Sequence, residues 1–540
     1  MAQFAFNNRR GEHSCVRWVL ESHAITMDLP SANSTARPTG WQFRESIIST
    51  VLASLLAAAV LLPLLNRKIL ANWDEAIYAE VAREFLGRNW LIPMWQFQPW
   101  LEKPPLSMWV TALFFHFFGA TQFWARATSA FAGIGVVTLQ HWIALRLRGL
   151  STAWISTLVL LSTLGFLRAS RRGELDVLLA LGCYAALWGL VQVRQGNPHG
   201  WYLFWIGFAF AAMTKGAASV TLILTAVILA AWNKWIWQDL RRPFVLGALL
   251  FAALVLPWHI YMLHIFGRSF LREYLGLHVI TRATRQIAGG AHPWWFYGEV
   301  LLARAAPWVL LFPFAMARAR RNRELREYFV FVLVVLCFFT AVATRLPKYI
   351  VPAYPALALI CGDMLAARMK QRSRSVWAGF ILISMALFCI ASAATRELRE
   401  SLTDTITAKG VVLHKSCEDR DLLLAALRKP AAGDVSGPVL LWQQDVVMQM
   451  QALLFYVHKP MQQVYVAAYP ADAAKAAHRY TNPKPLADFV TASPRLILLD
   501  RSSLPSLPAG MQFDPMVQGP TLAVGTIRLR LPSNPGDAAR

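Results

Sequence analysis

Apolar stretches of nearly the length that an α-helix needs to cross a bilayer, roughly 20 residues, recur along this chain. The first is SIISTVLASLLAAAVLLPLLN, residues 46–66, and the last covers residues 376–394. Further stretches of this kind lie between them, at 124–146, 151–168, 174–194, 201–214, 217–236, 243–265, 299–316, 328–344 and 348–367. A shorter one at 105–118 is expected to lie in the membrane interface or to re-enter the bilayer. We therefore predict an all-α polytopic membrane protein with about 11 to 13 transmembrane helices.

The composition supports this class of protein. Of the 540 residues, 56% are hydrophobic and only 15% are charged, whereas a soluble globular domain carries about 25% charged residues. The six cysteines include no CxxC pair, so the sequence predicts neither a disulfide framework nor a thiolate metal site.

The net charge of +23 is compatible with nucleic-acid binding, but its distribution indicates a membrane orientation instead. Lys and Arg concentrate in short connections between apolar stretches, as they do on the cytoplasmic side of membrane proteins. These connections contain Arg146, Arg148, Arg194, Lys234, Arg241, Arg242, Arg318, Arg320, Arg321, Arg323, Arg326, Arg368, Lys370, Arg372 and Arg374. No nucleic-acid partner is therefore expected.

This charge distribution also predicts how the chain is divided. Residues 1–45 are polar, lack the apolar core of a signal peptide, and are expected to form a disordered cytoplasmic tail. Residues 46–395 then form the transmembrane domain, with long periplasmic loops at 67–123 and 266–298. In residues 396–540, the short apolar runs GPVLLWQQD, QQVYVAAY and PRLILLD accompany the helix-like segments DLLLAALRK and ADAAKAAHRY. We predict a small periplasmic α/β domain there.

Two adjacent acids, Asp74 and Glu75, directly follow the first apolar stretch. They open the segment DEAIYAEVARE, in which Ile77, Val81 and Phe85 share one face of a helix. Such a helix is expected to lie on the membrane surface. The alternative role for Asp74 is that of an ordinary helix cap.

A second acid site is predicted on the same side of the membrane. Asp176, with Glu174 close by, begins the stretch 174–194, and Arg171 and Arg172 precede it. These acids are either solvated helix starts or part of a functional site. Acids beside cations are typical of glycosyl transfer, because carboxylates orient or deprotonate an acceptor while cations hold an anionic leaving group.

Further cations lie in the outward-facing segments, against the usual bias. Lys103 precedes two prolines in WLEKPPL, Lys348 and Tyr349 open TRLPKYIVPAYP, and Arg282 lies in the loop 266–298. Anionic phosphate at the outer membrane surface would explain this set. Contacts with lipid head groups and ion pairs with nearby acids are the alternatives.

Glu102 and His278 are candidate ligands of a divalent cation, because Zn²⁺ and similar metals accept histidine and carboxylate. A hydrogen-bonded or interfacial histidine is the alternative. No nucleotide-binding motif is visible, so no nucleotide cofactor is expected.

Together, DEAIYAEVARE, EKPPL, LDVLLAL, MTKG and LPKYIVPAYP resemble the lipid-linked-sugar glycosyltransferases of the GT-C fold. The similarity extends over roughly residues 46–370 and is greatest to the 4-amino-4-deoxy-L-arabinose lipid A transferases and the protein mannosyltransferases. It implies an inverting transferase of the bacterial inner membrane that moves a sugar, such as 4-amino-4-deoxy-L-arabinose, from a polyprenyl-phosphate donor to a periplasmic-side acceptor such as lipid A or another glycan.

The resemblance also implies roles for individual residues. Asp74, Glu75 and Asp176 would be catalytic, and Glu102 and His278 would bind any metal. It also implies that Lys103, Lys348 and Tyr349 bind substrate or phosphate. Arg171, Arg172 and Arg282 are expected to bind phosphate as well, because they are cations on the same outer side.

Other functions stay open at this point. A related transferase could use protein serine or threonine as its acceptor, and a lipid-linked-sugar transporter or a non-catalytic scaffold are functions of a different class. A transporter is expected to place ionisable residues near the bilayer midplane. Most acids here lie at the outer boundaries of the apolar stretches, which favours an enzyme.

Overall fold

The computed structural model of the chain describes residues 40–66, 70–71, 73–232, 242–286, 292–369, 437–442, 450–466, 484–518 and 522–529. Ser46–Arg540 forms one compact unit, separate from Met1–Glu45, and the contacts given below lie within this larger unit. The predicted span 376–394, the helices expected at 421–429 and 471–480, and the predicted tail as far as residue 39 lie outside the described residues.

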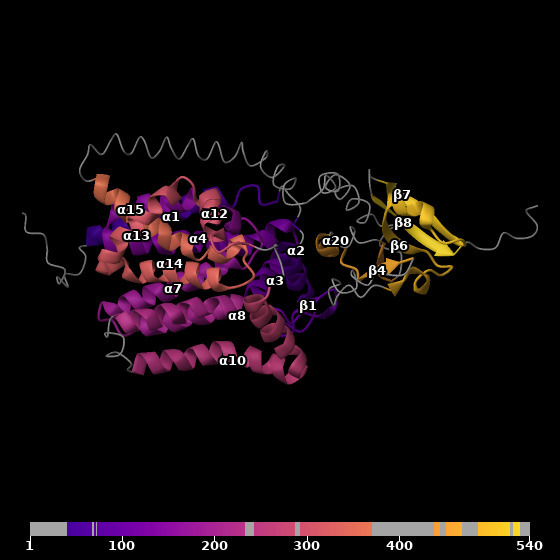
Figure 1. Cartoon of the computed structure of the whole chain (residues 1–540), viewed down its shortest axis with the longest axis horizontal. Helices are drawn as coiled ribbons and strands as arrows, with labels where there is room; N and C mark the ends of the chain where they lie inside the picture. Colours follow the sequence, from indigo (N-terminus) through magenta and orange to yellow (C-terminus); the bar gives the residue numbers. More distant parts are fainter. Residues whose placement is uncertain are drawn as a thin grey trace, which may run out of the picture. The chain divides into compact units, whose positions relative to one another are not determined.

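Long apolar helices pack side by side in a bundle, in which α7, α8 and α10 are neighbours (Figure 1). Their bounds are α1 (Gly40–Leu61), α4 (Gln122–Arg148), α5 (Leu150–Leu161), α6 (Leu164–Ser170), α7 (Asp176–Arg194), α8 (Gly200–Trp232), α10 (Arg242–Phe270), α12 (Phe296–Ala305), α13 (Phe312–Arg321), α14 (Arg326–Ala341) and α15 (Ala353–Met369). Within the described residues, the apolar stretches predicted between 46 and 367, apart from 105–118, fall on these helices or on the short turns between them.

The stretch predicted at 151–168 is bent rather than straight, because α5 and α6 meet at an angle of 70°. At the break, the Ser162 hydroxyl donates to the Leu158 carbonyl and the Thr163 hydroxyl donates to the Val159 carbonyl. Such side-chain bonds to the preceding turn compete with the helical ladder and favour bending.

Helix α8 contains a break at Lys215, whose backbone angles are not helical. The Trp232 ring at its end lies beneath the Arg326 guanidinium, 5.3 Å away, and Glu327 pairs with Arg194 at the end of α7. Gly200, at the start of α8, also lies against the last turns of α7. Both ends of α8 are therefore near one end of the bundle, and Lys215 lies at the other, as expected for two predicted spans.

That same end of the bundle carries an ion-pair cluster. The Asp363 carboxylate of α15 lies 2.5 Å from Arg148 and 3.2 Å from Arg318, and Arg148 also contacts Glu324 at 2.6 Å. These side chains join the ends of α4, α13 and α15. The opposite end of the bundle holds the predicted acid sites.

Five helices within the described ranges are long and apolar enough to cross a membrane, and six if the bent α5–α6 pair is one crossing. This number is lower than the predicted one for three reasons: α8 is folded on itself, α12 to α15 are short or interrupted, and the predicted span 376–394 lies outside the described residues. The predicted class, a multi-pass helical membrane protein with a C-terminal α/β region, is confirmed.

The loop after α1 contains α2 (Asp74–Glu84), a hairpin of β1 (Met94–Trp95) and β2 (Gln98–Pro99), and the short apolar helix α3 (Leu106–Phe118). The expectation of a surface helix with an exposed polar face is wrong, and so is the alternative that Asp74 caps this helix. Asp74 makes no capping bond, and Glu75, Glu80 and Glu84 are buried together with the apolar residues of α2. The helix is covered on all sides because it packs between α3 and a helix of the C-terminal region, α20 (Met450–Val457).

After α10, the chain continues through the π-helix η1 (Leu271–Thr281) and the single turn α11 (Arg282–Thr284). The turns η2 (Trp308–Leu311) and η3 (Arg323–Leu325) flank α13, and η4 (Pro347–Ile350) precedes α15. Backbone bonds from Thr344 to Arg282 and from Ala343 to Ala283 fasten α11 beside η4.

The C-terminal region contains a six-stranded sheet in the order β5-β4-β3-β6-β8-β7. The strands are β3 (Val439–Trp442), β4 (Met461–Tyr465), β5 (Lys484–Pro485), β6 (Arg495–Asp500), β7 (Met511–Gln518) and β8 (Leu522–Leu529). The first four pair in parallel, and β8 and β7 add an antiparallel edge. The three predicted apolar runs contain β3, β4 and β6.

The C-terminal region also contacts α2. The Glu80 carboxylate lies 3.0 Å from His458 Nδ1, and the Arg83 guanidinium donates to the Phe455 carbonyl. Tyr456 accepts from the Leu70 backbone and donates to Gln122 at 2.7 Å. The helix that begins with Asp74 therefore packs against α3 and against the C-terminal region.

Candidate active site

The two predicted acid sites meet around one lysine. The Lys348 ammonium, in η4, donates to the Asp74 carboxylate at the start of α2 and lies 3.3 Å from the Glu174 carboxylate. Asp176, the first residue of α7, also lies close enough to act on Lys348 electrostatically. Segments more than 270 positions apart thus converge at one end of the bundle.

A second lysine fixes Asp176. Lys215, at the break in α8, donates to the Asp176 carboxylate at 2.6 Å, and its ammonium lies 4.8 Å from the centre of the Tyr349 ring. Asp176 is only 2% exposed, so its charge is compensated within the protein. The break in α8 carries this ammonium to the level of the acid cluster.

The Asp74–Lys348 pair is ionised. Burial acts to raise the pKa of the Asp74 carboxyl, but Lys348, Lys103 and Lys215 together hold this pKa well below its usual range. Burial acts in the opposite direction on Lys348, and the surrounding acids, led by Asp74, nevertheless raise its pKa above the usual value. Asp74 keeps 31% of its side chain exposed, so the carboxylate remains accessible from outside.

Lys103 has a neutral hydrogen-bond partner. Its ammonium donates to the Tyr78 hydroxyl at 2.7 Å, from the Glu-Lys-Pro-Pro turn to α2. Burial is the main reason that the pKa of Lys103 falls to about 8; Lys215 and Arg282 lower it further, against the effect of Asp74 and Glu102. A cation in this state gains most from an incoming anion.

Glu75 has a full set of partners away from Lys348. Its carboxylate accepts two bonds from the Arg126 guanidinium, at 2.7 and 3.1 Å, and one each from the backbone of Ala71 and Gly173. Burial raises the pKa of Glu75, but the bonds from Arg126 outweigh it and the pKa is lowered. With 2% of its side chain exposed, Glu75 holds the two acid loops together, and its contacts indicate positioning rather than chemistry.

The structure places Arg171 outside the cluster. Its guanidinium donates to the carbonyls of Val60, Leu61 and Pro63, where α1 ends. Helix C-termini leave carbonyls without helical partners, so an arginine there serves the backbone. Arg172 is more than a third exposed and lies 3.7 Å from Glu174, at the edge of the acid cluster.

Arg282 and Tyr349 lie together beside the acids. Arg282, in α11, interacts with the Tyr349 hydroxyl and with the charge of Asp74. Its Nε is buried without a hydrogen-bond partner among the described residues. A buried guanidinium nitrogen of this kind is available to an anionic ligand.

Glu102 and His278 are brought together as predicted, with Oε2 and Nε2 3.5 Å apart. No group of three or more His, Cys, Asp or Glu side chains suited to a metal occurs in the part of the chain that the structure describes. A catalytic zinc site uses three protein ligands. The two residues do not amount to such a site, and no step is assigned to a metal.

Glu174 was named beside Asp176, but three members of the site were given no role from the sequence: Lys215, Tyr78 and Arg126. Lys215 and Arg126 had a detectable signal, since each is a cation inside or next to an apolar stretch, where charge is rare unless paired. Tyr78 is one of many tyrosines, and no comparable signal in the sequence distinguishes it.

Comparisons with known proteins show what the chain as a whole resembles. The family model of the dolichyl-phosphate-mannose-protein mannosyltransferases matches residues 48–268. An undecaprenyl phosphate-alpha-4-amino-4-deoxy-L-arabinose arabinosyl transferase of Erwinia tasmaniensis is 31% identical over 325 residues, which are 57% of this chain and 58% of the relative. A second transferase of this name, from Sodalis glossinidius, is 30% identical over 64% of each chain. The chain thus matches about three fifths of the length of these relatives.

The crystal structure of ArnT from Cupriavidus metallidurans bound to undecaprenyl phosphate superimposes with a TM-score of 0.68, at 20% identity, over 91% of this chain and 98% of ArnT. The chain has the ArnT fold. The apo structure of the same ArnT gives a TM-score of 0.69. The predicted resemblance to the GT-C glycosyltransferases of the ArnT and protein-mannosyltransferase type is confirmed.

Proposed function

We propose that the protein is an inverting glycosyltransferase that takes its sugar from a polyprenyl-phosphate donor. The observation that carries this proposal is the convergence of Asp74, Asp176 and three lysines at one end of a membrane-embedded bundle. The names of its relatives favour 4-amino-4-deoxy-L-arabinose as the sugar and undecaprenyl phosphate as the carrier. Lipid A is the acceptor that we propose on this basis.

In the reaction, an acceptor oxygen attacks the anomeric carbon as the bond from that carbon to the donor phosphate oxygen breaks. The bonding electrons pass to the phosphate, which leaves on its polyprenyl chain with one more negative charge. Lys103 and Arg282 would stabilise this charge, because the first has a neutral partner and the second a free Nε among the described residues. The polyprenyl tail would stay in the membrane.

Asp74 would orient the acceptor. Its carboxylate is ionised and partly exposed, and Lys348 keeps it in place. A phosphate acceptor on lipid A is already anionic, so positioning contributes more to rate than proton removal does. A hydroxyl acceptor would instead donate its proton to this carboxylate.

The orientation that suits this function places the candidate site and the C-terminal region on the periplasmic side of a bacterial inner membrane. The N-terminus would then be cytoplasmic, as would the Arg-rich end of the bundle near Asp363. Membrane lipids would surround the helices.

The test is the Asp74→Asn variant, which keeps size and removes charge. We expect transfer from a lipid-linked donor to fall by at least about 100-fold in membranes, with expression and thermal stability close to wild type. Arg172→Gln, at the exposed edge of the cluster, is the matched control and should retain most activity. Full activity of Asp74→Asn would refute the proposed site.

Protein is the second candidate acceptor, because the matching family model describes protein mannosyltransferases. Mass spectrometry of lipid A and of cell-surface proteins and glycans from a deletion strain separates the two. Loss of a sugar from lipid A alone supports the first proposal, and loss from protein alone supports the second.

A further inference from the structure

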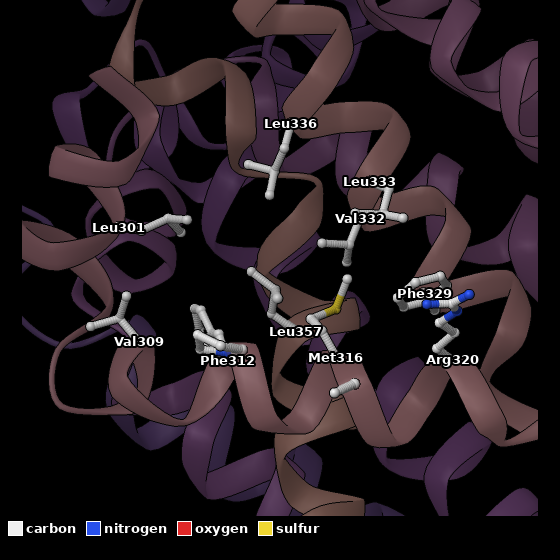
Figure 2. Close-up of a pocket in the computed structure, with 12 residues that line it drawn as sticks. Leu301, Val309, Phe312, Met316, Arg320, Phe329, Val332, Leu333, Leu336 and Leu357 are labelled. Carbon is white, nitrogen blue, oxygen red and sulfur yellow. The ribbon is translucent and has the colours of Figure 1, made fainter. Parts of the chain in front are cut away.

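A cavity of about 310 Å³ lies between helices at a distance from the acid cluster. Side chains of α12, η2, α13, α14 and α15 line it, and all but one of them are apolar. Figure 2 shows Arg320 at one edge of this cavity and Leu301 and Val309 at the opposite edge. The candidate site uses none of these residues.

Exposed apolar side chains lie at and beside the cavity. Leu333, which lines it, is 42% exposed. Leu310 and Phe314, next in the chain to the lining residues Val309 and Pro313, are 67% and 65% exposed. Large apolar side chains that are this exposed on a membrane-spanning bundle face lipid chains. The occupant therefore enters from the bilayer and is at least partly hydrocarbon.

The single charged lining residue, Arg320, indicates that the occupant also carries an anionic group. Arg320 is exposed, and it has no hydrogen bond or ion pair within the described ranges, whereas its neighbour Arg318 pairs with Asp363 at 3.2 Å. Helix geometry places Arg320 about 12 Å along α13 from Phe312, which lines the apolar part. A molecule that fills the cavity thus meets a guanidinium at the membrane surface.

We propose that this groove binds an anionic phospholipid, with an acyl chain along Phe312, Val332 and Leu333 and its phosphate at Arg320. Guanidinium binds phosphate through paired hydrogen bonds, and basic pockets between helices select anionic head groups. The acyl chain supplies the apolar contact, and Arg320 supplies the selectivity for an anionic head group. The site lies at the end of the bundle that carries Asp363, so it is separate from the candidate transferase site.

Native mass spectrometry of the full-length protein in detergent tests the proposal. The protein is mixed with equal amounts of phosphatidylglycerol and phosphatidylethanolamine that carry the same acyl chains. We expect wild type to retain phosphatidylglycerol at least about fivefold more than phosphatidylethanolamine. The Arg320→Gln variant should retain the two equally, and Ala317→Leu, which narrows the groove at an exposed position, should retain less of both.

Arg323→Gln is the matched control, because Arg323 is exposed near the same end and does not line the cavity. It should keep the wild-type preference, and all variants are compared for size and melting temperature without lipid. The proposal would be overturned if wild type retained the two lipids equally. It would also be overturned if Arg320→Gln and Arg323→Gln changed lipid retention equally, or if Ala317→Leu did not change it. Displacement of phosphatidylglycerol by polyprenyl phosphate would assign the groove to the carrier lipid instead. None of these outcomes depends on transferase activity.

Discussion

At the scale of single residues, Lys103 differs from the other lysines of the candidate site in its partner. Lys348 and Lys215 contact carboxylates, and Lys103 contacts a neutral hydroxyl. With its pKa lowered to about 8, mainly by burial, Lys103 loses its positive charge as the pH rises through that value.

We therefore expect kcat/KM for the lipid-linked donor to fall about tenfold per pH unit above pH 8, because only the protonated amine attracts phosphate. The Lys103→Arg variant keeps a charged side chain at this pH, so its decline should move to higher pH. The measurement is kcat/KM as a function of pH, between roughly pH 6.5 and 9.5. The protein must stay folded over this whole range. A wild-type profile that stays flat above pH 8 would show that Lys103 does not bind the donor.

The Glu75–Arg126 pair is the residue-scale contact on which the shape of the site depends. Both side chains are at most 8% exposed, so removal of either partner leaves a buried charge. We expect Glu75→Gln and Arg126→Gln each to destabilise the protein by about 3 kcal/mol. The double variant should cost much less than the sum of the two, which thermal unfolding in detergent measures; additive losses would contradict direct coupling.

Sequence patterns identified the acids of the site better than they identified the roles of its cations. Asp74, Asp176, Lys103 and Lys348 stand out because charge beside apolar stretches is costly unless it is used. Arg171 has the same signal, yet it binds the carbonyls at the end of α1. Only the fold distinguishes an arginine that donates to the carbonyls at a helix end from one that faces a ligand.

At the scale of elements, close packing of α7 against α8 sets the position of Asp176 and Lys215. A Cβ on Gly189 would lie 2.5 Å from the Phe204 nitrogen and 2.6 Å from the Gly200 oxygen, both backbone atoms. In an isolated helix, Gly→Ala would stabilise by up to about 1 kcal/mol. Here the steric conflict dominates, because backbone cannot move aside as a flexible side chain can.

We predict that Gly189→Ala destabilises the protein by about 1 to 3 kcal/mol. Gly298→Ala is the control, since a Cβ there meets nothing within 4 Å and Gly298 lies in α12. Melting temperatures should fall for the first variant and stay level or rise for the second. An equal response of the two would show that α7 and α8 do not pack this tightly.

The same scale shows where sequence periodicity fails. The pattern of Ile77, Val81 and Phe85 predicts an exposed face for α2, but that face is covered by α20, which lies more than 360 positions further along the chain. Strand β7 was not predicted for a local reason, because Asp514 and Pro515 interrupt its apolar pattern and Pro515 lies at a bulge. By contrast, β3 is a continuous apolar run buried on both faces, which is a clear signal.

At the scale of the whole molecule, the two ends of the bundle differ in how charge is arranged. One end gathers acids and cations from distant loops around Lys348, and the other carries many arginines, of which Arg148 and Arg318 pair with Asp363. Hydropathy and the distribution of Lys and Arg predicted this polarity, since both follow from transfer energies of single residues. The convergence of the loops depends on long-range packing, which no local pattern contains.

The proposed orientation is based on this polarity and is open to a direct test. We expect Gln98→Cys, exposed in the loop that carries Lys103, to react with a membrane-impermeant maleimide in intact cells. Arg323→Cys, exposed near the Asp363 end, should react only after the inner membrane is permeabilised. Both substitutions are made in a background without the six native cysteines, and labelling is read from the purified protein. Because arginines resist translocation, the opposite pattern would place the transferase site in the cytoplasm, where a periplasmic acceptor could not reach it.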